Sequence, residues 1–210
     1  MIKRIRSIVI YPFIAAYLVI ALGFTMRRSE EKLCTGLNIV LNDSINSCFL
    51  GKEDIENFIL SENTEMLGYP VHRINIREIE NELNGLAHIQ NAEVFYTMNG
   101  KLNVVIHQRT PIVRIISGIQ NTYYLDGEGY ILKSKGAFVP HILIASGYFS
   151  DGSELSSARH IDDLKDKERF TEWNDVFKIS SWINSNEFWK NQFVQIYFNS
   201  KKEFELIPRV

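Results

Sequence analysis

Two acidic residues within an Asp-Gly-Glu-Gly segment are the first side chains of this sequence that could bind a ligand. Asp126 and Glu128 offer the carboxylate oxygens that calcium prefers. A calcium loop of the EF-hand type that began at Asp126 would need glycine at its sixth position and glutamate at its twelfth. Because Ile131 and Ala137 stand at those positions, the segment predicts a hairpin turn and not a metal site.

The remaining candidates for catalysis are scattered along the chain. Ser146 precedes Gly147, but the leading glycine of a nucleophile elbow is missing. No glycine-rich segment opens a helix that could hold a phosphate. The sequence therefore predicts a protein that is not an enzyme, with no catalytic residue, no cofactor, no metal and no small-molecule substrate. Five histidines occur without metal-ligand spacing: His72, His88, His107, His141 and His160.

Two cysteines bear on the cellular compartment. Cys34 and Cys48 lack the CxxC spacing of a zinc site and have no histidine nearby. They are either two unpaired, half-buried thiols or, in an oxidising compartment, a disulfide that stabilises the fold by roughly 3 kcal/mol. The sequence leaves both alternatives open.

The composition indicates a folded protein and excludes one large class of partner. Of the 210 residues, 45% are hydrophobic and 12% aromatic, which supports a packed core. The formal net charge is −2, so the chain has no basic excess with which to bind a phosphate backbone. We therefore expect no nucleic-acid partner.

The N-terminus predicts a membrane anchor. A basic tip at residues 1–7 precedes an uncharged apolar run, and residues 8–26 are long enough to span a bilayer as one helix. A cleaved signal peptide is the alternative, but no Ala-x-Ala site follows the run. Arg27, Arg28 and Lys32 flank the far side, which weakens the charge asymmetry. The long polar remainder still favours a cytoplasmic N-terminus and an external C-terminal part.

The first half of the remaining chain has the order strand, helix, helix, strand, strand. Asn75 and Glu78 form a capping signal at the start of the second helix. Asn99-Gly100 between two alternating runs predicts a hairpin between the last two strands. The predicted strands are 37–41, 92–96 and 102–107, and the helices are 52–60 and 76–83.

Pro111 marks the junction between this unit and a second one. Leu102, Val104 and Ile106 alternate with polar neighbours up to His107, and a new apolar strand resumes at Ile112. Proline donates no ladder hydrogen bond, so it belongs at the start of a strand or at a joint. We predict a nearly rigid junction without a linker, in which Arg109 and Arg114 cap polar groups across the boundary.

Beyond Pro111 the sequence predicts mainly strands. A helix over 168–183 is followed by a short helix with Asn184 and Glu187 as its capping signal. The predicted strands are 112–116, 122–125, 130–132, 141–145, 193–198 and 204–207.

Several of these segments, in this order, resemble the FtsQ/DivIB family of bacterial cell-division proteins. The strand-helix-helix-strand-strand unit beside an anchor resembles a POTRA domain. The matching segments are His88-Ile89-x-x-Ala92-x-Val94, the run from Val104 to Ile115 with Gln108-Arg109-x-Pro111 at its centre, Tyr123-Tyr124-Leu125-Asp126-x-x-Gly129, Pro140 and Ser146-Gly147; Asn184 to Trp189 and Phe204 to Arg209 are similar to a Bacteroidetes-like branch.

The resemblance implies an α+β fold with a single N-terminal transmembrane helix. A POTRA domain (β-α-α-β-β) would be followed by a mostly antiparallel β domain with one or two helices. The expected divisions are a cytoplasmic tip at 1–7, the transmembrane helix at 8–26, the POTRA domain at 33–109 and the β domain at 110–210. The family's β domain continues past the strand at 204–207, so we expect this one to be truncated at its C-terminus.

The resemblance also implies a function. The protein would be a bitopic inner-membrane scaffold at the division septum, anchored through residues 8–26, with its C-terminal domains in the periplasm. It would bind FtsB-like and FtsL-like bitopic proteins and link them to septal peptidoglycan synthesis. Strand addition at an exposed edge would supply the contacts. The expected partner-binding residues are Asn91, Glu93, Phe95, Phe204 and Leu206, and the junction residues are Arg109, Pro111 and Arg114.

Two other functions are weighed against this one. A periplasmic POTRA-type chaperone or secretion adaptor would bind extended clients with the same strand edges, and localisation would separate it from a division protein. A membrane-anchored hydrolase would need a deep cleft with paired ionisable groups whose pKa values are shifted.

Overall fold

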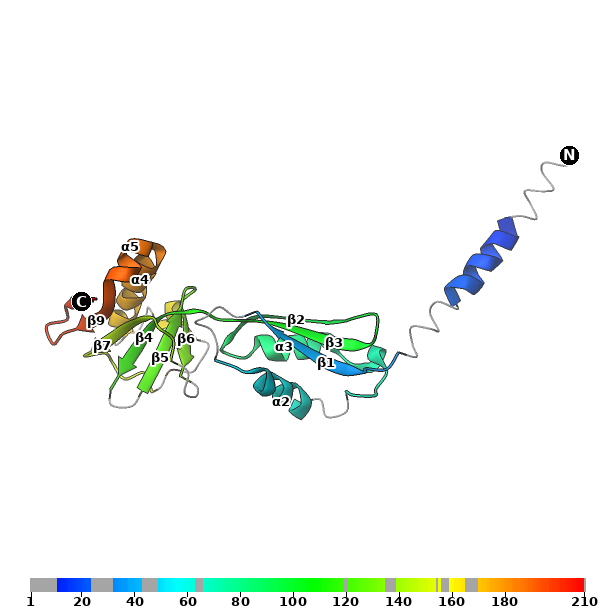
Figure 1. Ribbon diagram of the computed structural model, residues 1–210, viewed down its shortest axis with the longest axis horizontal. Helices are drawn as coiled ribbons and strands as arrows, with labels where there is room; N and C mark the ends of the chain where they lie inside the picture. The colour runs from blue at the N-terminus through cyan, green and yellow to red at the C-terminus, as the bar shows by residue number, and fades with distance from the viewer. Residues whose placement is uncertain are drawn as a thin grey trace.

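The computed structural model describes residues 11–23, 32–42, 49–62, 66–118, 121–134, 139–153, 155, 159–164 and 170–209. Residues 11–23 are helical, and the remainder forms two domains that follow one another in the chain, each with its own sheet (Figure 1). Within these ranges no helix is both long enough and apolar enough to cross a membrane. Residues 1–10 and 24–26 of the predicted tip and anchor lie outside the described residues, as does Cys48.

The first domain is a three-stranded sheet with two helices on one face. The order is β1-β3-β2, with β1 parallel to β3 and β2 antiparallel to it. This confirms the predicted succession of strand, two helices and two strands. The elements are β1 (Gly36–Leu41), α2 (Lys52–Glu62), the 3-10 turn η1 (Val71–Arg73), α3 (Ile76–Asn84), β2 (Ile89–Tyr96) and β3 (Lys101–Gln108).

Local sequence signals account for these elements. The Asn75 side chain accepts a hydrogen bond from the Glu78 backbone N–H at 3.4 Å and donates to the Glu78 carboxylate at 3.2 Å, so the predicted cap of α3 is confirmed. A register shift between Ile89 and Asn91 lets Ile89 and Ala92 both face the core. The buried core consists mainly of Ile39, Ile55, Ile59, Ile79, Leu83, Ile89, Ala92, Val94, Leu102, Val104 and Ile106.

The second domain is a seven-stranded sheet with its helices packed against one face. The order is β10-β9-β7-β4-β5-β6-β8. Trp173, Val176 and Ile183 of the long helix are buried against it, in one core with Val113, Ile115 and other strand residues. The elements are β4 (Pro111–Ser117), β5 (Asn121–Asp126), β6 (Tyr130–Lys133), β7 (Leu143–Gly147), β8 (Arg159–His160), the 3-10 turn η2 (Ile161–Leu164), α4 (Thr171–Ser185), α5 (Glu187–Gln192), β9 (Phe193–Phe198) and β10 (Phe204–Pro208).

The sheet is mostly antiparallel, as expected, but its centre is parallel. β7 is parallel to both β4 and β9, so the middle of the sheet is parallel and its outer pairs are antiparallel. Parallel neighbours need a long crossover connection, and the segment that contains α4 and α5 supplies it between β7 and β9. β7 also begins at Leu143 and not at His141 as predicted.

The predicted capping residue of the short helix was wrong. Asn184 lies within α4, and the side chain of Asn186 accepts hydrogen bonds from the backbone N–H groups of Phe188 and Trp189 at 3.0 and 3.3 Å. Both asparagines are followed by suitable helix formers. The helix begins after Asn186 because α4 continues to Ser185.

We predict that Gly147→Ala destabilises the second domain far more than Gly118→Ala. Gly147 has φ +118°, and a Cβ there would overlap the backbone of Phe198 in the neighbouring β9. Gly118 also has a positive φ, of +68°, but no described atom lies within 4 Å of the position that a Cβ would take there. We expect losses in the free energy of unfolding of about 3 kcal/mol for Gly147→Ala and about 1 kcal/mol for Gly118→Ala. Urea unfolding of both variants is the measurement, and equal losses would contradict the steric explanation.

Candidate partner-binding surfaces and the domain junction

The two domains are joined without a linker. β3 ends at Gln108 and β4 begins at Pro111, so only Arg109 and Thr110 lie between the two sheets. The backbone N–H of Arg109 donates to the carbonyl of His88 at 2.9 Å, which continues the pairing of β2 with β3 up to the boundary. The chain therefore passes from one sheet directly into the other.

Arg109 holds the hairpin turn between β5 and β6. Its Nη1 lies 2.8 Å from Asp126 Oδ2 and 3.0 Å from Glu128 Oε2, and its guanidinium carbon lies 3.7 Å from the centre of the Tyr130 ring. The Asp126 side chain is 4% exposed, and its Oδ1 accepts the backbone N–H groups of Glu128 and Tyr130 at 3.0 and 2.7 Å. Asp126 thus serves as the cap of a turn and as the ion-pair partner of the junction arginine.

An apolar cluster fills the other side of the junction. Phe49, from the segment before α2, is buried with Tyr124 and Leu132 of the second domain. The Phe49 ring lies 5.3 Å from the Tyr124 ring and 5.2 Å from the His88 ring. His88 Nε2 is 2.9 Å from the carbonyl oxygen of Lys133, a further polar contact between the domains. We call Phe49, Tyr124 and Leu132 the junction cluster.

Gln108 connects the junction cluster to the end of β3. Its side-chain oxygen accepts the backbone N–H groups of Phe49 and Leu50 at 3.0 and 2.9 Å, and its side-chain amide donates to the carbonyl of Leu50 at 2.9 Å. The Gln108 residue is 4% exposed. Buried amides of this kind fix backbone position because each unpaired group would cost about 1–3 kcal/mol.

The three predicted junction residues have different environments. Arg109 contacts polar groups of the second domain, and Pro111 opens β4. Arg114 is half-buried in β4, opposite Tyr124 and Ile144 of the adjoining strands, and its side chain makes no hydrogen bond or ion pair with the described residues. Sequence reasoning did not place Phe49 or His88 at the junction, because a single aromatic residue or histidine carries no signal of its long-range contacts.

The second domain has an open sheet edge at β10. The hydrogen bond from Asn199 N–H to the carbonyl of Glu203 at 3.0 Å starts the antiparallel ladder. Along an antiparallel ladder, every second residue directs its backbone N–H and C=O groups to the neighbouring strand. Counted from that pair, the backbone groups of Glu205 and Ile207 face β9, and those of Phe204 and Leu206 face away from it. No hydrogen bond from the described part of the chain reaches these outward groups. Leu206 and Ile207 are each 39% exposed, while Phe204 stacks on Phe198 at 4.8 Å.

The edge of the first domain at β2 is closed by side chains. Asn84 of α3 accepts the N–H of Ala92 at 2.8 Å and donates to the carbonyl of Ala92 at 3.3 Å. Glu80 accepts the N–H of Val94 at 3.1 Å. These are the groups that would face an added strand, so a partner strand would first have to displace α3 side chains.

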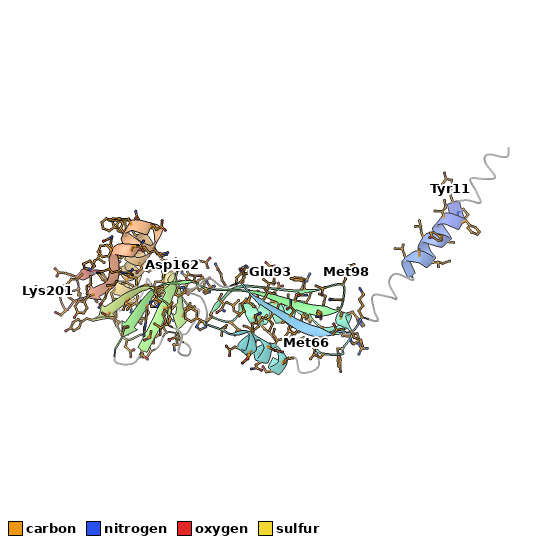
Figure 2. The ribbon with its side chains drawn as sticks, viewed as in Figure 1. Tyr11, Met66, Glu93, Met98, Asp162 and Lys201 are labelled. Carbon is orange, nitrogen blue, oxygen red and sulfur yellow. The ribbon has the colours of Figure 1, made fainter. Side chains whose placement is uncertain are left out.

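The predicted residues Asn91, Glu93 and Phe95 lie on the open face of the first sheet. All three are exposed, with Phe95 at 45%, and Figure 2 shows Glu93 on the outer side of β2. The register places Glu93 beside Val105 and Phe95 beside Asn103 on β3. Their side chains therefore form a sheet face, and not a strand edge, on which a partner could lie.

Among the described residues, two phenols have clearly shifted pKa values. Burial, with a smaller contribution from Cys34, raises the pKa of Tyr96 to about 12. Burial, and next Asp151, raises the pKa of Tyr123. Both hydroxyls therefore stay neutral at physiological pH. Across the described ranges, no three His, Cys, Asp or Glu side chains are arranged to hold a metal ion.

We predict that Arg109→Gln loosens the junction, whereas Glu128→Gln does not. The Arg109 and Asp126 side chains are 11% and 4% exposed, so loss of the arginine leaves a buried carboxylate without its cation. We expect a loss of about 3 kcal/mol in the free energy of unfolding. Glu128 is 53% exposed, and its loss should cost less than about 1 kcal/mol. Chemical unfolding gives both values, and residual dipolar couplings test whether the domains of Arg109→Gln reorient. A fixed orientation and unchanged stability would contradict the assigned role of the ion pair.

Comparison with known protein families assigns both domains. A model of the POTRA-like domain matches residues 32–107, and a model of the FtsQ/DivIB C-terminal related domain matches residues 110–210. The two residues between the matches, Arg109 and its neighbour Gln108, are those that hold the junction. A search of curated proteins returned no match. Because the two models follow one another along almost the whole chain after the N-terminal helix, the chain belongs to the FtsQ/DivIB family of cell-division proteins.

Proposed function

We propose that this protein is a non-enzymatic scaffold of the bacterial division machinery that holds partner proteins at the open edge of β10. The FtsQ/DivIB family consists of non-catalytic division proteins, so membership supports the scaffold role. The proposed binding site for a partner rests on the contrast between two sheet edges, β10 and β2. The β10 edge has outward backbone groups without partners among the described residues, and the β2 edge is occupied by Asn84 and Glu80.

Strand addition is the chemistry that this edge supports. An extended partner segment would form main-chain hydrogen bonds with Phe204 and Leu206, and its alternate side chains would contact the exposed surfaces of Leu206 and Ile207. Pro208 has no N–H, which limits the length of the new ladder at that end. Because Leu206 and Ile207 point to opposite faces of β10, the edge selects a short segment that is apolar on both faces.

The proposed partners are FtsB-like and FtsL-like bitopic division proteins, whose assembly would be linked to septal peptidoglycan synthesis. In this proposal residues 8–26 anchor the protein in the inner membrane, its N-terminus is cytoplasmic and both domains are periplasmic at the septum. The junction around Arg109 would keep the two domains in a fixed relation. A partner on β10 and a contact on the POTRA sheet face, at Asn91, Glu93 and Phe95, would then be held at a fixed separation.

A POTRA-type chaperone or secretion adaptor remains the second candidate function. It would add client strands to the first domain, and the closed β2 edge counts against that mode. The exposed face around Phe95 is what favours it, because a client could lie across the sheet without pairing.

We predict that Leu206→Pro abolishes partner binding and that Leu206→Ala weakens it only slightly. Proline removes the outward N–H while an edge strand tolerates its ring, and alanine keeps the N–H and loses only side-chain contact. We expect a loss of more than about tenfold in affinity for Leu206→Pro and about threefold for Leu206→Ala. The measurement is binding of the full chain to the FtsB-like protein of the same cell. Circular dichroism and urea unfolding establish that both variants fold. Equal affinities for the two variants would exclude a role for the β10 backbone.

We predict that a fluorescent fusion of the full chain concentrates at midcell in dividing cells. A division scaffold is recruited to the septum, whereas a chaperone that serves many clients has no reason to leave the rest of the envelope. The Leu206→Pro fusion is a useful comparison, because POTRA contacts would still recruit it when β10 contacts are lost. A uniform envelope signal from the unaltered fusion would reject the division role and favour the chaperone.

A further inference from the structure

A pocket of about 520 Å³ lies at the end of the second sheet where its parallel strands begin. Its walls come from the first residues of β4, β7 and β9, from the last turns of α4, and from α5. This volume falls in the range of small-ligand sites. The pocket is separate from the outward backbone groups of Phe204 and Leu206, and nothing in the proposed scaffold role requires it.

The charges around the pocket are of one sign. His141, Lys190 and Arg209 line it, and no aspartate or glutamate does. Within the described residues, the side chains of Lys190 and Arg209 form no ion pair. Since the whole chain carries a formal net charge of −2, two unpaired cations beside one hollow are a local exception. They favour an anionic ligand.

One polar group on the pocket wall has no partner. Ser180 is fully buried, and its hydroxyl makes no hydrogen bond with the described residues. Ser180 lies on α4 and is one of the residues that line the pocket. Neighbouring atoms close the hydroxyl oxygen off from the pocket, so the polar contacts of a ligand would come from Lys190 and Arg209. Most of the other wall is apolar, and includes Ile112, Leu143, Ile183 and Phe193.

We propose that this pocket binds a short aliphatic carboxylate, either as a free acid or as the carboxylate at the end of a peptide. The carboxylate would lie between Lys190 and Arg209, and the aliphatic part would contact the apolar wall. The limited volume suits a chain end or a small molecule, and does not suit a strand that passes through. The proposal is independent of strand addition at β10.

The test titrates the isotope-labelled full chain with N-acetyl-leucine and follows the backbone amides of Ser180, Asn191 and Phe193 by NMR. Neutral N-acetyl-leucinamide is the matched control ligand, and inorganic phosphate tests for a general anion site. We expect saturable binding of the carboxylate with a Kd on the order of 1 mM, and at least about tenfold weaker binding of the amide. Equal binding of the amide, or tighter binding of phosphate, would overturn the proposal. 4-Methylpentanoate and N-acetyl-alanyl-leucine then distinguish a free acid from a peptide end, because the better ligand identifies the source.

Three single substitutions locate the binding site. Lys190→Gln and Arg209→Gln should each weaken N-acetyl-leucine binding by about fivefold or more, because each removes a charged hydrogen-bond donor. Both residues are exposed, so neither change should affect folding. Lys201→Gln is the matched control, since Lys201 is an exposed lysine in the turn between β9 and β10 and is not among the pocket residues (Figure 2). Unchanged affinity in both pocket variants, or an equal loss in Lys201→Gln, would reject the assigned site.

Discussion

The ion pair between Arg109 and Asp126 is the contact on which the relation between the two domains depends. It joins the residue after the last POTRA strand to the hairpin of the second sheet at 2.8 Å. A buried pair of this kind contributes little net stability but is costly to break, because either partner alone would leave a charge without compensation. The main effect of the ion pair is therefore on the orientation of the domains, and not on the free energy of unfolding. Together with the junction cluster and the His88 contact, it specifies one arrangement of two sheets that share a continuous chain.

The junction contacts bear on how partners at the β2 and β10 edges would be placed relative to one another. In a flexible protein, a partner on one domain would have no defined relation to a partner on the other. Here the β2 edge is closed by Asn84 and Glu80, and the outward groups of β10 remain available. Edge strands that are left open invite pairing with other chains, and proteins usually protect them. The protection of β2, while β10 is left open, is what favours β10 over β2 as the place where a partner binds.

Local patterns predicted most of the elements, and long-range contacts explain what the patterns missed. The alternation from Leu102 to Ile106 and the cap at Asn75 depend on neighbouring residues, so both were readable from the sequence. The burial of Phe49 depends on Gln108, which lies 59 residues further along the chain. The exposed face at Phe95 followed from alternation, whereas the closure of the β2 edge requires α3 to lie beside it.

The parallel centre of the second sheet is the feature that the sequence concealed most completely, and it also creates the carboxylate pocket. A short apolar strand such as β7 has the same pattern whether its neighbours are parallel or antiparallel. Once β7 and β9 are parallel, the chain must return across one face, and α4 and α5 are placed over the strand beginnings. That return brings Ser180 and Lys190 to the same hollow as the first residues of β4. The crossover that completes the sheet thus places a cationic pocket close to the junction. A ligand bound there would contact α4, α5 and the start of β4, the first strand after the POTRA domain.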